Sequence, residues 1–89
     1  MAQTYAVTIK MVGGKMAFDP RTKAIARGDT VEWTNSMGME HTVTSDDGSS
    51  FDSKEIEPGK TFSHTFNDAG SFPYHCEIHG FMKGTIAVA

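Results

Sequence analysis

Three side chains that can bind a soft metal ion lie close together near the end of the chain. Cys76, His79 and Met82 offer a thiolate, an imidazole and a thioether in the spacing Cys-x2-His-x2-Met. This segment follows a predicted strand and forms a loop, and a loop can bring the three side chains around one centre. In a straight strand they could not meet, because alternate side chains point to opposite faces. The spacing therefore predicts a metal site on this loop.

A second imidazole must come from a distant part of the chain, and His41 is the best candidate. It begins a predicted strand after the loop 36–40, so it can lie at the same end of the fold as Cys76. Two imidazoles, one thiolate and a long axial thioether make up the blue-copper electron-transfer site. We therefore expect one copper ion, held by His41, Cys76, His79 and Met82, that cycles between Cu(II) and Cu(I).

The same residues could also serve a cysteine nucleophile, a copper enzyme, a copper carrier or a zinc site. A cysteine nucleophile needs a base oriented by a third group, an oxyanion hole and a cleft, and the sequence offers no such third group. A copper enzyme needs further copper sites, for which the four histidines are too few, so we expect no enzyme activity. A copper carrier remains the alternative function. A carrier should release Cu(I) readily to a partner, whereas an electron shuttle should not. Zinc could replace copper in a recombinant preparation, because Cys and His bind it well.

The remaining histidines are predicted to be structural. Strand alternation points His75 away from the face of Cys76, and His64 lies between Phe62 and Phe66 on one face of a strand. The scattered methionines form no copper-transfer motif. We expect the following residues in the core or at its edge: Met11, Met16 and Trp33.

Short alternating or apolar runs, separated by Gly, Pro, Asp and Asn clusters, predict an all-β protein. No segment has a 3.6-residue apolar period over a useful length, although one helical turn fits residues 51–55. Strands at intervals of about 8–12 residues predict a Greek-key β-sandwich of seven or eight strands. The predicted strands are 5–11, 16–18, 23–27, 30–35, 41–45, 61–66, 71–76 and 83–89.

Length and composition set further bounds. With 89 residues the chain is expected to form one domain, residues 1–89. The net charge of -3 and the lack of any Lys or Arg run weigh against nucleic acid as a partner. No apolar stretch approaches the roughly 20 residues that span a bilayer. The first residues contain no basic and then apolar segment, so we expect a signal peptide to be absent or already removed.

Two segments together resemble the cupredoxins of the plastocyanin/azurin family, and amicyanin-like proteins most of all. Residues 28–35, G-D-T-V-E-W-T-N, resemble the family segment G-D-x-V-x-W-x-N. Residues 74–84, Y-H-C-E-I-H-G-F-M-K-G, resemble its ligand loop, and the two-residue gap between His79 and Met82 has the amicyanin length. The resemblance extends over residues 4–89, which is essentially the whole chain.

The resemblance implies roles for the four candidate ligands. His41 and His79 would bind copper through Nδ1, Cys76 through its thiolate, and Met82 as the weak axial ligand. It also implies redox protein partners such as a c-type cytochrome or an amine-oxidising dehydrogenase, and a location in the periplasm or outside the cell. We expect a monomer.

His79 is expected to be the ligand nearest solvent, with its ring edge as the port for electrons. A small apolar surface suits weak, short-lived docking of redox partners. The residues expected around the port are Met37, Met39, Ile78 and Phe81.

Several positions differ from the family pattern. Thr42 stands where many relatives have an Asn that braces the ligand loop, and its hydroxyl can still form a hydrogen bond across the loop. Glu77-Ile78 replaces the common Thr-Pro, so we expect a looser loop. The carboxylates of Glu40 and Glu77 are expected to lower the reduction potential by favouring Cu(II).

Overall fold

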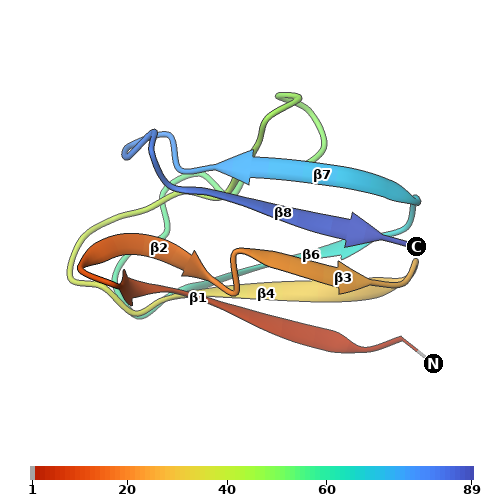
Figure 1. Ribbon diagram of the computed structural model, residues 1–89, viewed down its shortest axis with the longest axis horizontal. Helices are drawn as coiled ribbons and strands as arrows, with labels where there is room; N and C mark the ends of the chain where they lie inside the picture. Colours follow the sequence, from red (N-terminus) through yellow and green to blue (C-terminus); the bar gives the residue numbers. More distant parts are fainter. Residues whose placement is uncertain (1) are drawn as a thin grey trace.

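The computed structural model describes residues 2–89 as two four-stranded sheets packed face to face (Figure 1). The eight strands are β1 (Thr4–Val12), β2 (Lys15–Asp19), β3 (Thr22–Ile25), β4 (Asp29–Asn35), β5 (Thr44–Ser45), β6 (Thr61–Phe66), β7 (Gly70–His75) and β8 (Lys83–Val88). One sheet has the order β2-β1-β4-β6 and the other β3-β8-β7-β5. The predicted all-β Greek-key sandwich is confirmed.

The strands pair in both directions. β1 runs parallel to β4, and β3 runs parallel to β8. The other neighbouring pairs are antiparallel. β1 begins and β8 ends at one end of the sandwich, on the right in Figure 1, whereas the loop between β7 and β8 lies at the opposite end.

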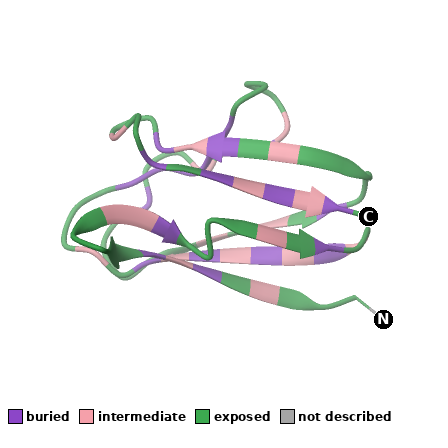
Figure 2. Cartoon of the chain, viewed as in Figure 1, coloured by how far each residue is buried: buried purple, intermediate pink, exposed green. Residues whose placement is uncertain are grey.

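Alternating side chains fill the space between the sheets. In β4 the burial alternates along the strand, so Val31 and Trp33 face inward while Glu32 does not. Figure 2 shows the same alternation of buried and less buried residues along β4 and β8. This pattern is typical of strands with one face on a core.

Aromatic rings dominate the centre of the core. Trp33 is fully buried, and its ring centroid lies 5.4 Å from that of Tyr74 and 5.8 Å from that of Phe51. Phe62 and Phe66 of β6 also contact Trp33. Trp33 is therefore a core anchor, as predicted.

Met11 is not in the core, and that prediction was wrong. It is 50% exposed, because β1 continues past the sandwich into a hairpin in which Met11 pairs with Met16 of β2. Met16 is partly buried against the core, as expected for the core edge.

Two further segments differ from the sequence prediction. Residues 51–55 form no helical turn; the Asp52 carboxylate instead accepts a hydrogen bond from the backbone N–H of Lys54, which has φ +58°. The expected strand 41–45 is shortened to β5, and His41 forms only an isolated bridge with Ile56. The described residues contain no helix that is long and apolar enough to cross a membrane.

Candidate metal centre

The loop between β7 and β8 is closed by two backbone hydrogen bonds. The N–H of Cys76 donates to the carbonyl of Met82 at 3.1 Å, and the N–H of Met82 donates to the carbonyl of His79 at 2.9 Å. The three residues of the Cys-x2-His-x2-Met spacing are thus folded against one another. The prediction that a loop gathers them is supported by this geometry.

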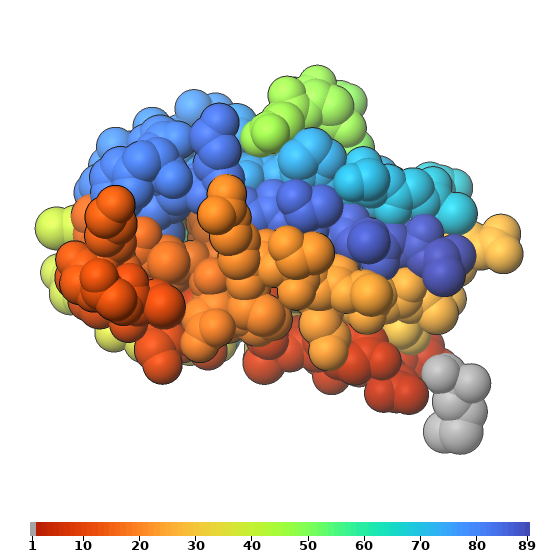
Figure 3. Space-filling model, viewed as in Figure 1, coloured from red at the N-terminus to blue at the C-terminus, as the bar shows by residue number. Residues whose placement is uncertain are grey.

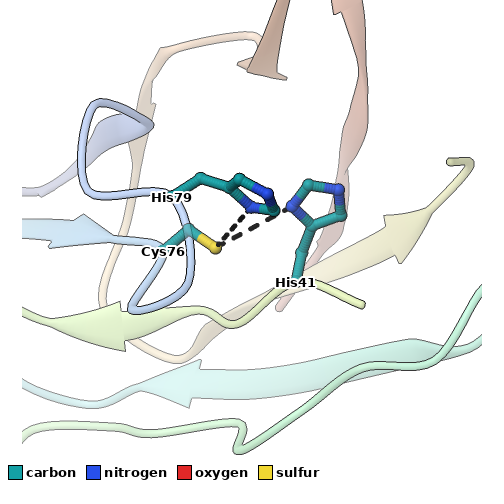
Figure 4. A group of neighbouring side chains, drawn as sticks. All are labelled: His41, Cys76 and His79. Atoms are coloured by element: carbon teal, nitrogen blue, oxygen red, sulfur yellow. Dashed lines mark hydrogen bonds between the residues drawn. The ribbon is translucent and has the colours of Figure 1, made fainter. Parts of the chain in front are cut away.

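Donor atoms from the loop and from His41 converge on one point. The Cys76 Sγ lies 3.8 Å from Nδ1 of His41 and 3.7 Å from Nδ1 of His79 (Figure 4). The three donor atoms all lie within 4.8 Å of one another. Ligands arranged in a plane at about 2.0–2.3 Å from one ion would be separated by roughly 3.5–4.0 Å, and both sulfur–nitrogen separations lie in this range.

The fourth predicted residue, Met82, is at the same place in the fold. Its side chain is 1% exposed, and its backbone is bonded to Cys76 and His79 as described above. Together the four residues offer two imidazoles, one thiol and one thioether, a donor set that suits copper in both oxidation states.

His41 is held by contacts that fix its backbone. Its N–H donates to the carbonyl of Ile56 at 3.3 Å, and the N–H of Ile56 donates back at 2.7 Å. Burial, and to a lesser extent the neighbouring His79, lowers the pKa of His41. The ring is therefore neutral at pH 7, which is the form that binds a metal ion.

Asn35, at the end of β4, positions the segment that leads to His41. Its fully buried side chain donates hydrogen bonds from Nδ2 to the carbonyls of Met39 at 2.8 Å and Ile56 at 2.9 Å, and its Oδ1 accepts one from the N–H of Met37 at 3.0 Å. This role of Asn35 is not among those predicted from the sequence. The sequence pattern that could have indicated it is an Asn at a strand end before a Gly-containing loop, because Asn side chains often form hydrogen bonds with the backbone there.

Thr42 joins the two halves of the site. Its hydroxyl accepts a hydrogen bond from the N–H of Glu77 at 2.8 Å, and its own N–H donates to the Cys76 Sγ at 3.4 Å. The expected hydrogen bond across the loop is therefore present. An N–H directed at the sulfur stabilises the negatively charged thiolate.

The other two histidines do not belong to the group of donor atoms. His75 Nδ1 lies 2.5 Å from a carboxylate oxygen of Asp46, and its Nε2 lies 3.5 Å from a carboxylate oxygen of Glu77. His64 packs its ring against Phe51 and Phe66 at centroid distances of 5.1 and 4.7 Å. Both positions agree with the structural roles that the sequence predicts.

Exposed apolar side chains on the loops that carry the donor residues form what we call the apolar rim. Three large apolar side chains are exposed there, Met39 at 47%, Ile78 at 47% and Phe81 at 62%, and Met37 packs partly against the core. The ring of Phe81 contacts that of His79 at a centroid distance of 6.1 Å. His79 itself is partly exposed, unlike the buried His41 and Cys76.

Comparison with known proteins agrees with this site. The model of the family "Copper binding proteins, plastocyanin/azurin family" matches residues 5–89. Plastocyanin of Scenedesmus fuscus is 34% identical over 96 residues, which cover 92% of this chain and 98% of that protein. Amicyanin of Paracoccus denitrificans is 32% identical over 78 residues, covering 83% of this chain and 60% of that protein.

Solved structures of related proteins have the same fold. Oxidised amicyanin with a proline-to-alanine substitution superposes with a TM-score of 0.86 at 29% identity, covering 97% of this chain and 82% of that one. The purple cupredoxin of Nitrosopumilus maritimus gives a TM-score of 0.86 at 28% identity, covering 96% and 99%.

The sandwich and its His, Cys, His and Met cluster define a cupredoxin, a small copper protein built on two β-sheets. The chain belongs to the plastocyanin/azurin family of copper-binding proteins. It is accordingly a type 1 copper protein that carries single electrons, and not an enzyme.

Proposed function

We propose that His41, Cys76, His79 and Met82 hold the copper ion of this electron carrier. The observation that carries the assignment is the convergence of Sγ of Cys76 with Nδ1 of both histidines, with separations from the sulfur of 3.7 and 3.8 Å. Met82 would supply a weak thioether ligand, because it lies on the same loop and its backbone is hydrogen bonded to Cys76 and His79.

Copper, when bound, supplies one-electron exchange between Cu(II) and Cu(I). The protein contributes a site that changes little between the two states. Cys76 and His41 are fully buried, and the hydrogen bonds of Thr42 and Asn35 fix the segments that carry them. Burial of these two ligands also favours an electron shuttle over a carrier that must release its metal to a partner.

The route for electrons is the exposed edge of His79. It is the one partly exposed member of the three-residue donor group, and Phe81 of the apolar rim contacts its ring. Weak redox complexes bury small surfaces, which this rim can provide. We propose that a c-type cytochrome or an amine-oxidising dehydrogenase docks there, because amicyanin is among the relatives.

The setting of the protein is part of the same proposal. Residues 1–89 act as one domain, since both sheets contribute to one core, and we propose that this domain is a monomer. The periplasm or the cell exterior is the proposed location, on the basis of the family resemblance. Sedimentation of the copper-loaded protein and fractionation of the native host test these two points.

The visible spectrum of the copper-loaded protein tests the ligand assignment. An intense blue band should appear with Cu(II) and disappear when ascorbate is added. Cys76→Ala should abolish the band, whereas His64→Gln, a substitution remote from the donor atoms, should keep it. A colourless wild-type protein, or a band that survives Cys76→Ala, would refute the assignment.

A further inference from the structure

A groove lies beside the ligand loop, on the side of the β1–β2 hairpin. It has a volume of about 440 Å³, and its apolar lining includes Met16, Phe18, Phe81 and Met82. Figure 3 shows the two chain segments that meet there, the orange surface of β2 and the blue surface of the ligand loop. Three exposed cations also line it, and we call the whole feature the cationic groove: Lys15, Arg21 and Lys83.

The positive charge of the cationic groove is not neutralised within the protein. Asp19 is the one carboxylate in its lining, and it lies 3.9 Å from Lys10, outside the groove. Within residues 2–89, Lys15, Arg21 and Lys83 have no carboxylate within ion-pair distance. A chain whose net charge is -3 therefore presents a local positive surface here.

The cationic groove lies next to the metal centre, so a protein bound in it would be close to the copper site. Met82, the proposed axial ligand, lines the groove. A protein bound there would lie beside the centre on the side of Met82, and the groove and the rim share Phe81, whose ring contacts His79. Unpaired cations around an apolar floor match a partner with carboxylates around an apolar patch.

We infer that the cationic groove docks an acidic electron-transfer protein, in addition to the partner that uses the His79 rim. This inference rests on the proposed function. A second copy of this chain is the less suitable occupant, because electron exchange between identical carriers produces no net transfer. Electrostatic steering by such a surface raises association rates and weakens as salt is added.

Two charge-reversal variants with the same change in net charge test the inference. Lys15→Glu/Lys83→Glu alters the groove, and Arg27→Glu/Lys60→Glu alters two exposed cations that do not line it. The probe is cytochrome b5, an acidic haem protein. In stopped flow, ferrous cytochrome b5 loses one electron and the oxidised copper protein gains it.

The groove variant should react at least tenfold more slowly than the control variant at an ionic strength of about 10 mM, and the difference should vanish near 500 mM. Binding is measured independently by ¹⁵N NMR with both proteins reduced, so that no electron moves. Amide shifts should map to β2 and residues 81–83 and be absent in the groove variant. If that variant is unfolded, Lys15→Ala/Lys83→Ala replaces it.

Three results would overturn the inference. The two variants could slow the reaction equally, the NMR shifts could surround His79 alone, or sedimentation could show self-association that the groove variant abolishes. The proposed function is tested separately by the blue band, which both variants should retain. If the wild-type protein shows no blue band, the proposed function is refuted, whereas the docking surface is judged by the three results above.

Discussion

The hydroxyl of Thr42 accepts a hydrogen bond from the backbone N–H of Glu77 at 2.8 Å, across 35 residues of sequence. It connects the segment that carries His41 to the loop that carries Cys76. The same hydroxyl lies 3.0 Å from that of Thr44, so a small polar network continues into β5. The two chain segments that make the site are therefore held together without help from the metal.

Removal of this hydroxyl should loosen the site. Thr42→Val keeps the shape of the side chain but leaves the Glu77 N–H without its acceptor, and we expect a loss of roughly 1–3 kcal/mol of unfolding free energy in the copper-free protein. Urea unfolding measures it. Thr42→Ser, which retains the hydroxyl, is the control and should stay close to wild type. A Val variant as stable as the Ser variant would contradict the proposed role.

Asn35 should be among the most sensitive polar positions. Asn35→Ala removes three hydrogen bonds and takes their partner from the Met39 carbonyl and the Met37 N–H, so we expect a loss of roughly 2–3 kcal/mol or more. The His41 segment should also become mobile, which hydrogen exchange at the amide of Ile56 would detect. Asn67→Ala, at an exposed turn, is the matched control. Equal stability of the two variants would show that Asn35 does not position the segment.

Gly84 is restricted by its neighbour across the sheet. A Cβ at this position would lie 2.5 Å from Cζ and Oη of Tyr74, which is fully buried. Gly84→Ala should therefore destabilise the fold by about 1–3 kcal/mol, as overpacked cores do. Gly38→Ala has nothing within 4 Å and should be nearly neutral. Thermal melts of both variants check this, and a stable Gly84→Ala protein would mean that the Tyr74 ring can move.

His64 should make stability depend on pH. Burial lowers its pKa below the unfolded value of 6.5, so the unfolded chain takes up a proton first as the pH falls. The stabilisation is complete above the unfolded pKa and decreases as the pH drops below 6.5. The unfolding free energy of the copper-free wild-type protein, measured with urea, should decrease more steeply from pH 7 to 5 than that of His64→Gln. Parallel pH profiles would argue against this contribution.

The carboxylates beside the ligand loop should tune the reduction potential. Glu77 has a 62% exposed side chain and Glu40 is also exposed, so water screens both charges. Glu77→Gln and Glu40→Gln should each raise the potential, by an amount on the order of tens of millivolts at most. Asp68→Asn, in the β6–β7 turn at the far end of the sandwich, serves as the control. No upward shift in either Glu variant would refute the effect.

Local patterns in the sequence predicted most of the strands and the donor residues. The alternating strand pattern predicted Trp33 in the core, and the Cys76 to Met82 spacing predicted the loop that brings the proposed ligands together, because both features depend on neighbours along the chain. Such features can be recognised without knowledge of which strands pair.

Features that depend on contacts between residues far apart in the sequence could not be predicted and are seen only in the structure. The parallel alignment of β1 with β4 and the three hydrogen bonds of Asn35 join residues far apart in sequence, and no local pattern specifies them. The exposure of Met11 could not be predicted for the same reason, because it depends on how far the paired strands β1 and β2 extend beyond the core. The cationic groove likewise forms where β2 meets the start of β8.

Because β1 starts and β8 finishes at the end of the sandwich remote from the ligand loop, a tether can be added without covering the redox centre (Figure 1). Anchoring the molecule to an electrode through a thiol-free tag after Ala89 would orient the His79 edge and the cationic groove outward, toward dissolved partners. Immobilised in this way, the protein would exchange electrons with proteins in solution more readily than with the surface that holds it.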